Sequence, residues 1–405
     1  MESAFGWTQV ARSDVAKAAA LLRNEEQGVR DEIGFLTLHQ GFADRFFPGT
    51  SVLQTRLRYA LFVPWQIEDL EGHPLARSLA ADQRLRASER RLVLRLKGAG
   101  DGVIGLRSTN YEPAQPPSTI YWTALRLWGI LNPSATNSWP GRGEVLARMD
   151  ASRWSDDREE GMTPLLEPTF FALPNRPDDW STDAALTFRL SPPEKRYLVE
   201  RVGEAKRIAP GSLGDESLLA RLAKSKKRPS SWVKAGYASP LLKELADKED
   251  RPALEVAIAA ASLAHIGRAA YSAIVERMAK ADGRKPGTRF AQELEEIVEA
   301  RRKSACSCKL PEVEAFIGKL NQKFHAALAN TIDWLKSSGD VMELWKSYCD
   351  SEQERKGTRA RLPKTAHAET LRTAWMASDV PKAESLNYRW HRVGAMLDDL
   401  HGLHV

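Results

Sequence analysis

Apolar residues recur at helical spacing along most of the chain, and strict alternation of apolar and polar residues is scarce. The pattern predicts two weak strand candidates, residues 93–96 and 187–190. Beyond residue 191 the helical pattern is nearly continuous. We expect helices there at residues 192–202, 217–224, 240–248, 252–279, 292–302, 313–335, 341–348, 368–375 and 387–400.

The first part of the chain predicts shorter helices separated by turns. These helices are expected at residues 10–22, 35–47, 53–61, 84–96 and 119–128. Residues 132–193 are rich in Pro, Gly, Trp and Asp and hold no period, which indicates an irregular connection. The fold class is therefore mainly α, with three parts. They are an N-terminal helical functional half with irregular loops and few short strands (1–131), the irregular segment (132–193) and a C-terminal helical half (194–405).

The composition is that of a folded protein and allows a polyanionic partner. Of the 405 residues, 42% are hydrophobic and 28% charged, which is enough apolar material for a sizeable core. Lys and Arg number 59 against 53 Asp and Glu, a net charge of +6. This modest excess permits nucleic-acid binding without requiring it. The three cysteines are too few for a disulfide framework.

Signals for membranes, cofactors and several enzyme classes are missing from the sequence. The N-terminus lacks the basic start and apolar core of a signal peptide. The longest apolar stretch, 257–264, is far shorter than the ~20 residues that span a bilayer. Motifs of the forms GxxxxGK[ST], GxGxxG directly after a strand, HExxH and GxSxG do not occur. We therefore expect a cytoplasmic protein with no membrane partner, cofactor or metal.

The densest polar cluster lies between residues 31 and 65. A helix that begins at Gly49-Thr50-Ser51 would offer free backbone N–H groups to a phosphate, with Arg45, Arg56 and Arg58 close by. The alternative is a capped helix whose arginines pair with Asp31, Glu32 and Asp44 in a structural ion network.

A basic run follows between residues 84 and 97, in which only Glu89 is acidic. Its cations are Arg84, Arg86, Arg90, Arg91, Arg95 and Lys97. A second basic run occupies residues 221–234. Stripes of this kind neutralise phosphates and give salt-sensitive binding to nucleic acid. The alternative is an ordinary solvated charged face.

An aromatic pair follows the rigid Pro116-Pro117 dipeptide. Tyr121 and Trp122 are expected in the first part of a helix. If exposed, they can stack on nucleic-acid bases or form a pocket wall. If buried, they belong to the core.

Several short segments resemble a bacterial family of unknown function that is encoded in phage-defence islands. They are 31–34 (DEIG), 42–45 (FADR), 47–51 (FPGTS), 54–59 (QTRLRY), 63–65 (VPW), 102–105 (GVIG), 118–122 (STIYW) and 386–390 (LNYRW). They are also similar to a defence DNA glycosylase of the bacteriophage replication inhibition type. That resemblance implies removal of glucosylated hydroxymethylcytosine from T-even phage DNA, leaving abasic sites.

The residues are compatible with such an activity. Base excision needs a flipped base, a pocket for it and a carboxylate that stabilises the sugar cation or activates water. Asp44 is the first candidate for the carboxylate, followed by Asp31 and Glu32. The candidate pocket residues are Gln54, Tyr59, Tyr121 and Trp122. The candidate DNA contacts are Arg45, Thr50, Ser51, Arg56, Arg58, Arg86, Arg90, Arg91, Arg95 and Lys97.

Two further expectations follow for the reaction and its alternative. The stretch around Asp44 has no lysine to form a Schiff base, which favours a monofunctional glycosylase without lyase chemistry; Lys97 is the nearest lysine downstream. The competing hypothesis is a non-catalytic DNA-binding component of a defence system. A nuclease is not supported, because no acidic triad with a partner lysine stands at metal-binding spacing.

Overall fold

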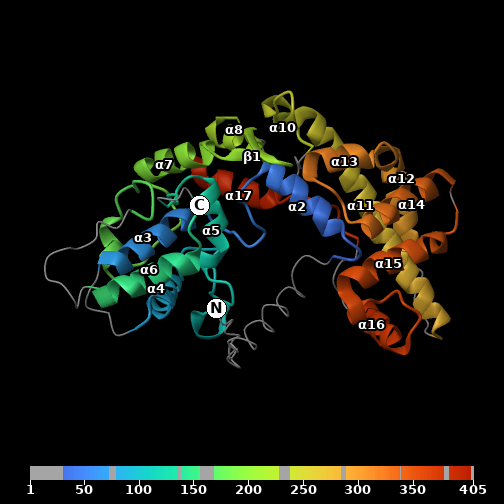
Figure 1. Cartoon of the computed structure of the whole chain (residues 1–405), viewed down its shortest axis with the longest axis horizontal. Coiled ribbons are helices and arrows are strands. Elements are labelled where there is room, and N and C mark those ends of the chain that lie inside the picture. The colour runs from blue at the N-terminus through green and yellow to red at the C-terminus, as the bar shows by residue number, and fades with distance from the viewer. Residues whose placement is uncertain are drawn as a thin grey trace, which may run out of the picture.

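The computed structural model describes residues 31–72, 79–134, 138–155, 168–227, 238–283, 289–337, 339–377 and 383–402. Within these ranges the protein is mainly helical and its only sheet is one two-stranded hairpin, which confirms the expected fold class. The elements form an arch with a group of helices in each limb and a connecting layer across the top (Figure 1).

The first limb packs around the aromatic face of α3. Tyr59, Phe62 and Trp65 of this helix are fully or almost fully buried. The rings of Trp180 and Phe188, from the segment that follows α6, cover them. The helices of this limb are α3 (Tyr59–Gly72), α4 (Ala81–Arg95), α5 (Pro117–Leu127), α6 (Arg142–Ser155) and α7 (Pro192–Gly203).

The second limb is built around α11 (Asp250–Ala281), whose many alanines let neighbouring helices approach closely. By length and composition α11 could cross a membrane, but 89% of its most apolar window is buried within the protein, as in a core helix. Around it lie α12 (Arg289–Cys306), α13 (Leu310–Ile317), α14 (Gln322–Ser337), α15 (Trp345–Lys356) and α16 (Ala366–Met376).

The connecting layer brings together segments from both ends of the chain (Figure 1). Its strands β1 (Lys206–Ala209) and β2 (Ser212–Glu216) pair antiparallel around Gly211, whose φ of 82° suits glycine. Its helices are α2 (Phe35–Phe46), α8 (Leu218–Lys224), α10 (Pro240–Leu245) and α17 (Trp390–His401). Short 3₁₀ turns complete the described elements: η2 (Thr109–Tyr111), η3 (Asp178–Ser181), η4 (Val341–Leu344) and η5 (Gly357–Arg359).

The expected helix after Gly49 is wrong for residues 50–58, which form a loop, and α3 begins only at Tyr59. The side chain of Gln54 accepts a hydrogen bond from Ser51 N and donates one to the Gly49 carbonyl. Such side-chain bonds to nearby backbone compete with helix formation. Gly49 therefore marks a turn, with a φ of 80°, and not the start of a helix that could hold a phosphate.

Other local expectations also need correction. Residues 93–96 end helix α4, and residues 187–190 form no strand, while the hairpin was not predicted. Residues 132–193 are not irregular throughout, because α6 lies among them. The single helix expected at 313–335 is two helices, separated at Gly318 with a φ of 90°. The helix expected at 10–22 lies outside the described residues.

Candidate functional site at the junction of α2 and α17

The candidate carboxylate Asp44 lies in the last turns of α2, where it meets a segment from the far end of the chain. Arg389 Nη1 lies 2.6 Å from Asp44 Oδ1, and the two residues are 345 positions apart in the sequence. The Asp44 side chain is 47% exposed, whereas that of Arg389 is 11% exposed. Asp44 is thus held by a cation and still reachable from solvent.

The loop that follows α2 is fixed to the same C-terminal segment. Arg389 Nη1 also donates to the Thr50 carbonyl at 2.7 Å, and Arg392 Nε donates to the Val52 carbonyl at 3.0 Å. Asp399 accepts hydrogen bonds from the Arg56 guanidinium and from Leu57 N at 2.7 Å. The loop is therefore irregular in conformation but held at both ends by α17 and the residues before it.

The backbone at this junction is strained. Tyr388 and Arg389 have φ values of 48° and 63°, in the left-handed region that non-glycine residues rarely adopt. The surroundings hold them there: the buried Tyr388 hydroxyl donates to the Ala257 carbonyl at 2.7 Å, and Arg389 N donates to Asn387 Oδ1 at 3.0 Å. Strain of this kind costs of order 1–3 kcal/mol per residue and gathers at functional sites. The strained turn aims Arg389 at Asp44.

Two histidines lie beside the Asp44–Arg389 pair. His391 is exposed, and its Nε2 lies 2.8 Å from Asn387 Nδ2. His39, one and a half turns before Asp44 on α2, is only 5% exposed and its Nε2 has no hydrogen-bond partner. Burial, with Arg389 and Arg268 next, lowers the pKa of His39 to about 4. His39 is therefore neutral at pH 7.

Replacing His39 with asparagine is expected to flatten the pH dependence of stability between pH 6.5 and 4. The unfolded chain binds a proton near pH 6.5 and the folded chain only near pH 4, so acidification in this range favours unfolding. His39 should account for a loss of about 2 kcal/mol between pH 7 and pH 5. Urea unfolding at both pH values measures the difference, with His325→Asn as the control. An unchanged difference in His39→Asn would contradict this assignment.

The other two candidate carboxylates are engaged in the fold. Asp31 Oδ1 accepts from Gly34 N and Leu36 N at 2.8 and 3.3 Å, and Oδ2 pairs with Arg355. Glu32 is 6% exposed and pairs with Arg268 at 3.1 Å. Burial raises the pKa of Glu32, although Arg268 opposes the shift. Neither carboxylate joins Asp44 at the junction with α17.

The candidate pocket residues use their polar groups within the protein. Gln54 and Tyr121 are almost completely buried, and the Tyr121 hydroxyl donates to the Arg56 carbonyl at 2.7 Å. The buried Tyr59 hydroxyl accepts from Ile104 N, and the half-buried Trp122 donates from Nε1 to the Pro140 carbonyl. These four residues form part of the packed interior of the first limb. Tyr121 is a core residue, the second of the two alternatives for it.

Four of the candidate DNA-binding arginines are likewise buried or nearly so. Their partners are distant in sequence: Arg45 pairs with Asp250, Arg56 with Asp399, Arg58 with Glu194, and Arg95 donates to the carbonyls of Asp179, Trp180 and Ala184. Arg45, Arg56 and Arg58 therefore belong to a structural ion network, as the alternative interpretation proposed. Their acidic partners are Asp250, Asp399 and Glu194, and not the expected Asp31, Glu32 and Asp44. Thr50 is also buried, donating from Oγ1 to the Phe47 carbonyl, and Ser51 accepts from Leu53 N.

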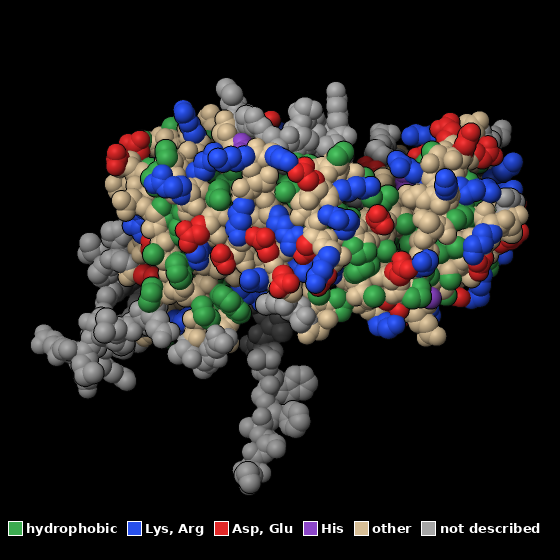
Figure 2. Space-filling model, turned by 90° about the horizontal axis from the view of Figure 1, so that it is seen from above, with side chains coloured by type: hydrophobic (Ala, Val, Ile, Leu, Met, Phe, Trp, Pro, Cys, Tyr) green, Lys and Arg blue, Asp and Glu red, His purple; other side chains and the backbone are tan. Residues whose placement is uncertain are grey.

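The remaining candidates lie at the surface. Arg86, Arg90 and Arg91 are about half exposed, and each pairs with one acid: Asp82, Glu112 and Asp183. Lys97 is exposed in the loop after α4. On the upper face, Lys and Arg side chains are interspersed with Asp and Glu (Figure 2). The described residues of that face form no continuous basic stripe.

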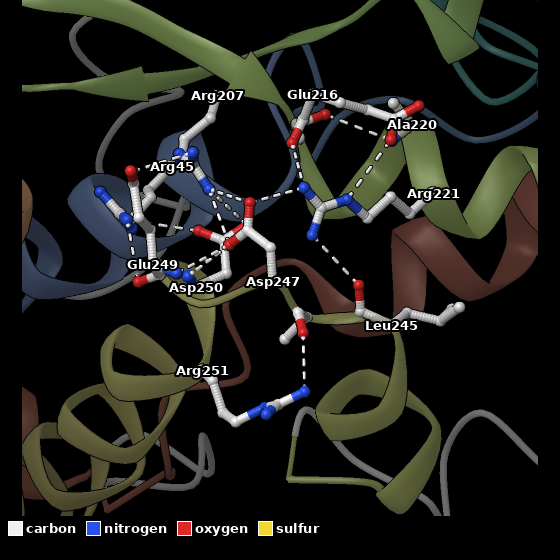
Figure 3. Close-up of polar contacts among 12 residues, drawn as sticks. Arg45, Arg207, Glu216, Ala220, Arg221, Leu245, Asp247, Glu249, Asp250 and Arg251 are labelled. Carbon is white, nitrogen blue, oxygen red and sulfur yellow. Dashed lines mark hydrogen bonds and ion pairs between the residues drawn. The ribbon is translucent and has the colours of Figure 1, made fainter.

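Arg45 enters a buried ion network that joins three parts of the connecting layer to α11 (Figure 3). Asp250, fully buried at the start of α11, contacts Arg45 at 3.3 Å and Arg207 of β1 at 3.1 Å. Asp247 contacts Arg207 at 2.9 Å and Arg221 of α8 at 2.6 Å. Burial opposes the ionisation of Asp247, but hydrogen bonds from Arg221, Arg207 and the backbone N–H groups of Glu249 and Asp250 together lower its pKa. Burial raises the pKa of Asp250.

Sequence reasoning missed the residues that surround Asp44 or fix the loop after it: Arg389, His39, Asn387, His391 and Arg392. The only signal was the segment 386–390, which was noted for its resemblance and not for any contact. Within the described residues, no group of three or more His, Cys, Asp or Glu side chains is placed to hold a metal ion.

Comparison with known proteins finds a similarity for the first part of this chain. No curated protein and no solved structure matches it. The matched region contains Asp44 and the loop after it, while Arg389 and α17 lie outside. Residues 3–189 match the model described as "Family of unknown function (DUF6361)", so this part of the chain is similar to that family.

Proposed function

We propose that this protein is a DNA glycosylase that excises glucosylated hydroxymethylcytosine from phage DNA and leaves abasic sites. The observation that carries the proposal is the Asp44 carboxylate, half exposed and fixed by Arg389 at a strained turn. The choice of base rests on the resemblance of the short segments around Asp44 to a defence glycosylase. The modest net charge of +6 is compatible with a DNA substrate.

The reaction needs only water as a co-reactant. Cleavage breaks the bond between the sugar C1′ and the base nitrogen, and the bonding electrons leave with the base. The Asp44 carboxylate is suited to stabilise the positive charge that develops on the sugar and to accept a proton from the attacking water. The water oxygen bonds to C1′, and the departing base takes up a proton. Arg389 would hold the Asp44 carboxylate in place through their ion pair.

The loop next to Asp44 supports this role because it presents apolar side chains to solvent. Val52 and Leu53 are 36% and 44% exposed. Arg392, itself exposed, holds the Val52 carbonyl through Nε. Proteins that open DNA insert apolar side chains between bases. In this proposal Leu53 and Val52 enter the stack, Arg392 contacts a phosphate, and the flipped nucleotide reaches Asp44.

Leu53→Ala is expected to weaken base unstacking and to slow base release about 10- to 100-fold, since unstacking one base step costs about 2–3 kcal/mol and the apolar wedge offsets this cost. The fluorescence of 2-aminopurine beside the target base reports the unstacking. Leu94→Ala is the matched control, because Leu94 is 50% exposed and belongs to α4 and not to this loop. If both substitutions slow base release equally, the loop does not take part in the DNA interface.

The proposal is tested by incubating the full-length protein with T4 genomic DNA and with unmodified DNA. Mass spectrometry detects released base, and alkaline cleavage detects abasic sites. We expect free glucosylated base from the modified DNA alone. DNA binding without release of any base would overturn the enzyme assignment.

A non-catalytic DNA-binding component is the second candidate. The observation that favours it is the engagement of Gln54, Tyr59, Tyr121 and Trp122 in internal hydrogen bonds, which leaves none of them free to bind a flipped base. On that hypothesis Asp44→Asn should leave both DNA binding and phage protection intact.

A further inference from the structure

A cavity of about 870 Å³ lies in the second limb, between the end of α11 and the start of α16. Met342 of η4 closes one side of it. Its volume is within the range of ~300–1,000 Å³ that is typical of small-molecule sites. The lining residues are Arg277, Met278, Lys280, Ala281, Asp282, Met342, Lys364, Thr365, Ala366, Glu369 and Arg372.

Among the described residues, the lining has a net positive charge, because four cationic side chains face two carboxylates. Asp282 is already neutralised: Arg372, which is 2% exposed, binds its Oδ2 through Nε and Nη2 at 2.9 and 2.6 Å. Arg277 pairs with Asp340 at the edge of the cavity. Lys280 and Lys364 are exposed and have no acidic partner among the described residues. These two lysines are therefore available to an anion.

The position of Lys364 is defined by its neighbours. Its Nζ lies 4.6 Å from the centre of the Trp345 ring, a cation–π contact that keeps the ammonium near the cavity. The following residue, Thr365, caps α16 and accepts from Ala368 N, and Thr365 and Ala366 both line the cavity, so α16 begins at the lining. The helix dipole adds to the positive potential that the lysines create.

The rest of the lining is apolar or accepts hydrogen bonds. Met278, Ala281 and Met342 provide an apolar wall far larger than a phosphate group needs. Glu369 lines the cavity and pairs with no cation among the described residues, so its carboxylate can accept a hydrogen bond from a ligand hydroxyl. The cavity thus combines an anion site with room for an apolar body that carries hydroxyl groups.

We propose that this cavity binds a small phosphate ester of the mononucleotide type. The phosphate contacts Lys280 and Lys364 near the start of α16, the planar body lies on Met278 and Met342, and a sugar hydroxyl donates to Glu369. α16 lies at the foot of the second limb, away from α2 and α17 (Figure 1). No lining residue of the cavity belongs to the site around Asp44 and Arg389, so the inference does not depend on the proposed base excision.

Isothermal titration calorimetry of the full-length protein with AMP, adenosine and inorganic phosphate tests the proposal. AMP should bind best, inorganic phosphate more weakly, and adenosine at least tenfold more weakly than AMP. Adenosine binding as tightly as AMP, or the absence of binding by both AMP and phosphate, overturns the proposal.

Reversing the charge of the two cavity lysines tests whether AMP binds in this cavity. Lys364→Glu and Lys280→Glu should each weaken AMP binding at least tenfold, and both lysines are exposed, so folding should be unaffected. Lys303→Glu on α12 is the matched control, an exposed lysine outside the lining, and should bind AMP like the unmodified protein. Undiminished binding in both cavity variants would show that AMP binds elsewhere and would refute the assignment.

Discussion

Asp44→Asn is expected to reduce base release from glucosylated T4 DNA about 10³-fold, within the range for loss of a catalytic acid–base group. Asparagine has the shape of aspartate and can still accept a hydrogen bond from Arg389 through its carbonyl oxygen. It has neither the charge to stabilise the sugar cation nor the basicity to activate water. Single-turnover release, followed by mass spectrometry, measures the loss.

The same variant should fold and bind DNA nearly as the unmodified protein does. The Asp44 side chain is 47% exposed, and ion pairs this exposed contribute only ~0–1 kcal/mol. Asp340→Asn is the matched control, because Asp340 is 51% exposed and also pairs with an arginine. If Asp44→Asn releases base as fast as Asp340→Asn, Asp44 is not the catalytic carboxylate.

Arg207→Met is expected to cost about 3–5 kcal/mol of the free energy of unfolding, the usual penalty for removing one partner from a buried ion pair. Arg207 is 1% exposed and contacts Asp247, Glu249 and Asp250. Without it, the fully buried Asp250 retains only Arg45, at 3.3 Å. Urea unfolding at pH 7, followed by circular dichroism, measures the change.

Arg176→Met is the control variant. It tests whether removing any arginine with two acidic neighbours lowers the free energy of unfolding as much. Arg176 is 36% exposed and contacts Glu68 and Asp69, so its removal should cost only ~0–1 kcal/mol. Arg207→Met combined with Asp250→Asn should recover part of the loss, because the buried Asp250 charge is then gone, while Arg45 keeps its hydrogen bond to the Glu249 carbonyl. Equal costs for the two single arginine variants would show that the network contributes no more than surface pairs do.

Helices were predictable wherever apolar residues alone determine the structure. The period through 252–279 identified α11 because its apolar residues meet neighbours on nearly every side. The loop after Gly49 was not predictable from that period, since Leu53 points to solvent while Gln54 is buried and bonded to the backbone. There, hydrogen bonding by one side chain overrides the spacing of leucines.

The candidate site was predictable only in part, for a related reason. Asp44 was a candidate because arginines and turn residues surround it in the sequence. The sequence does not show which arginine pairs with it. Arg45 and Arg56 have acidic partners 205 and 343 positions away in the numbering, Asp250 and Asp399. An arginine that will pair in the interior and one that stays at the surface look alike until the chain is folded.

The attachment of α17 to the loop after α2 also has a consequence for biosynthesis. A ribosome completes Asp44 long before Arg389, and the contacts between them close a loop of 345 residues. Contacts so distant in sequence form late in folding. A nascent chain, or one cut short before residue 387, would carry the carboxylate without the arginine that orients it. If the site cleaves DNA bases as proposed, that activity appears only after nearly the whole chain has been translated, which spares the host from active fragments.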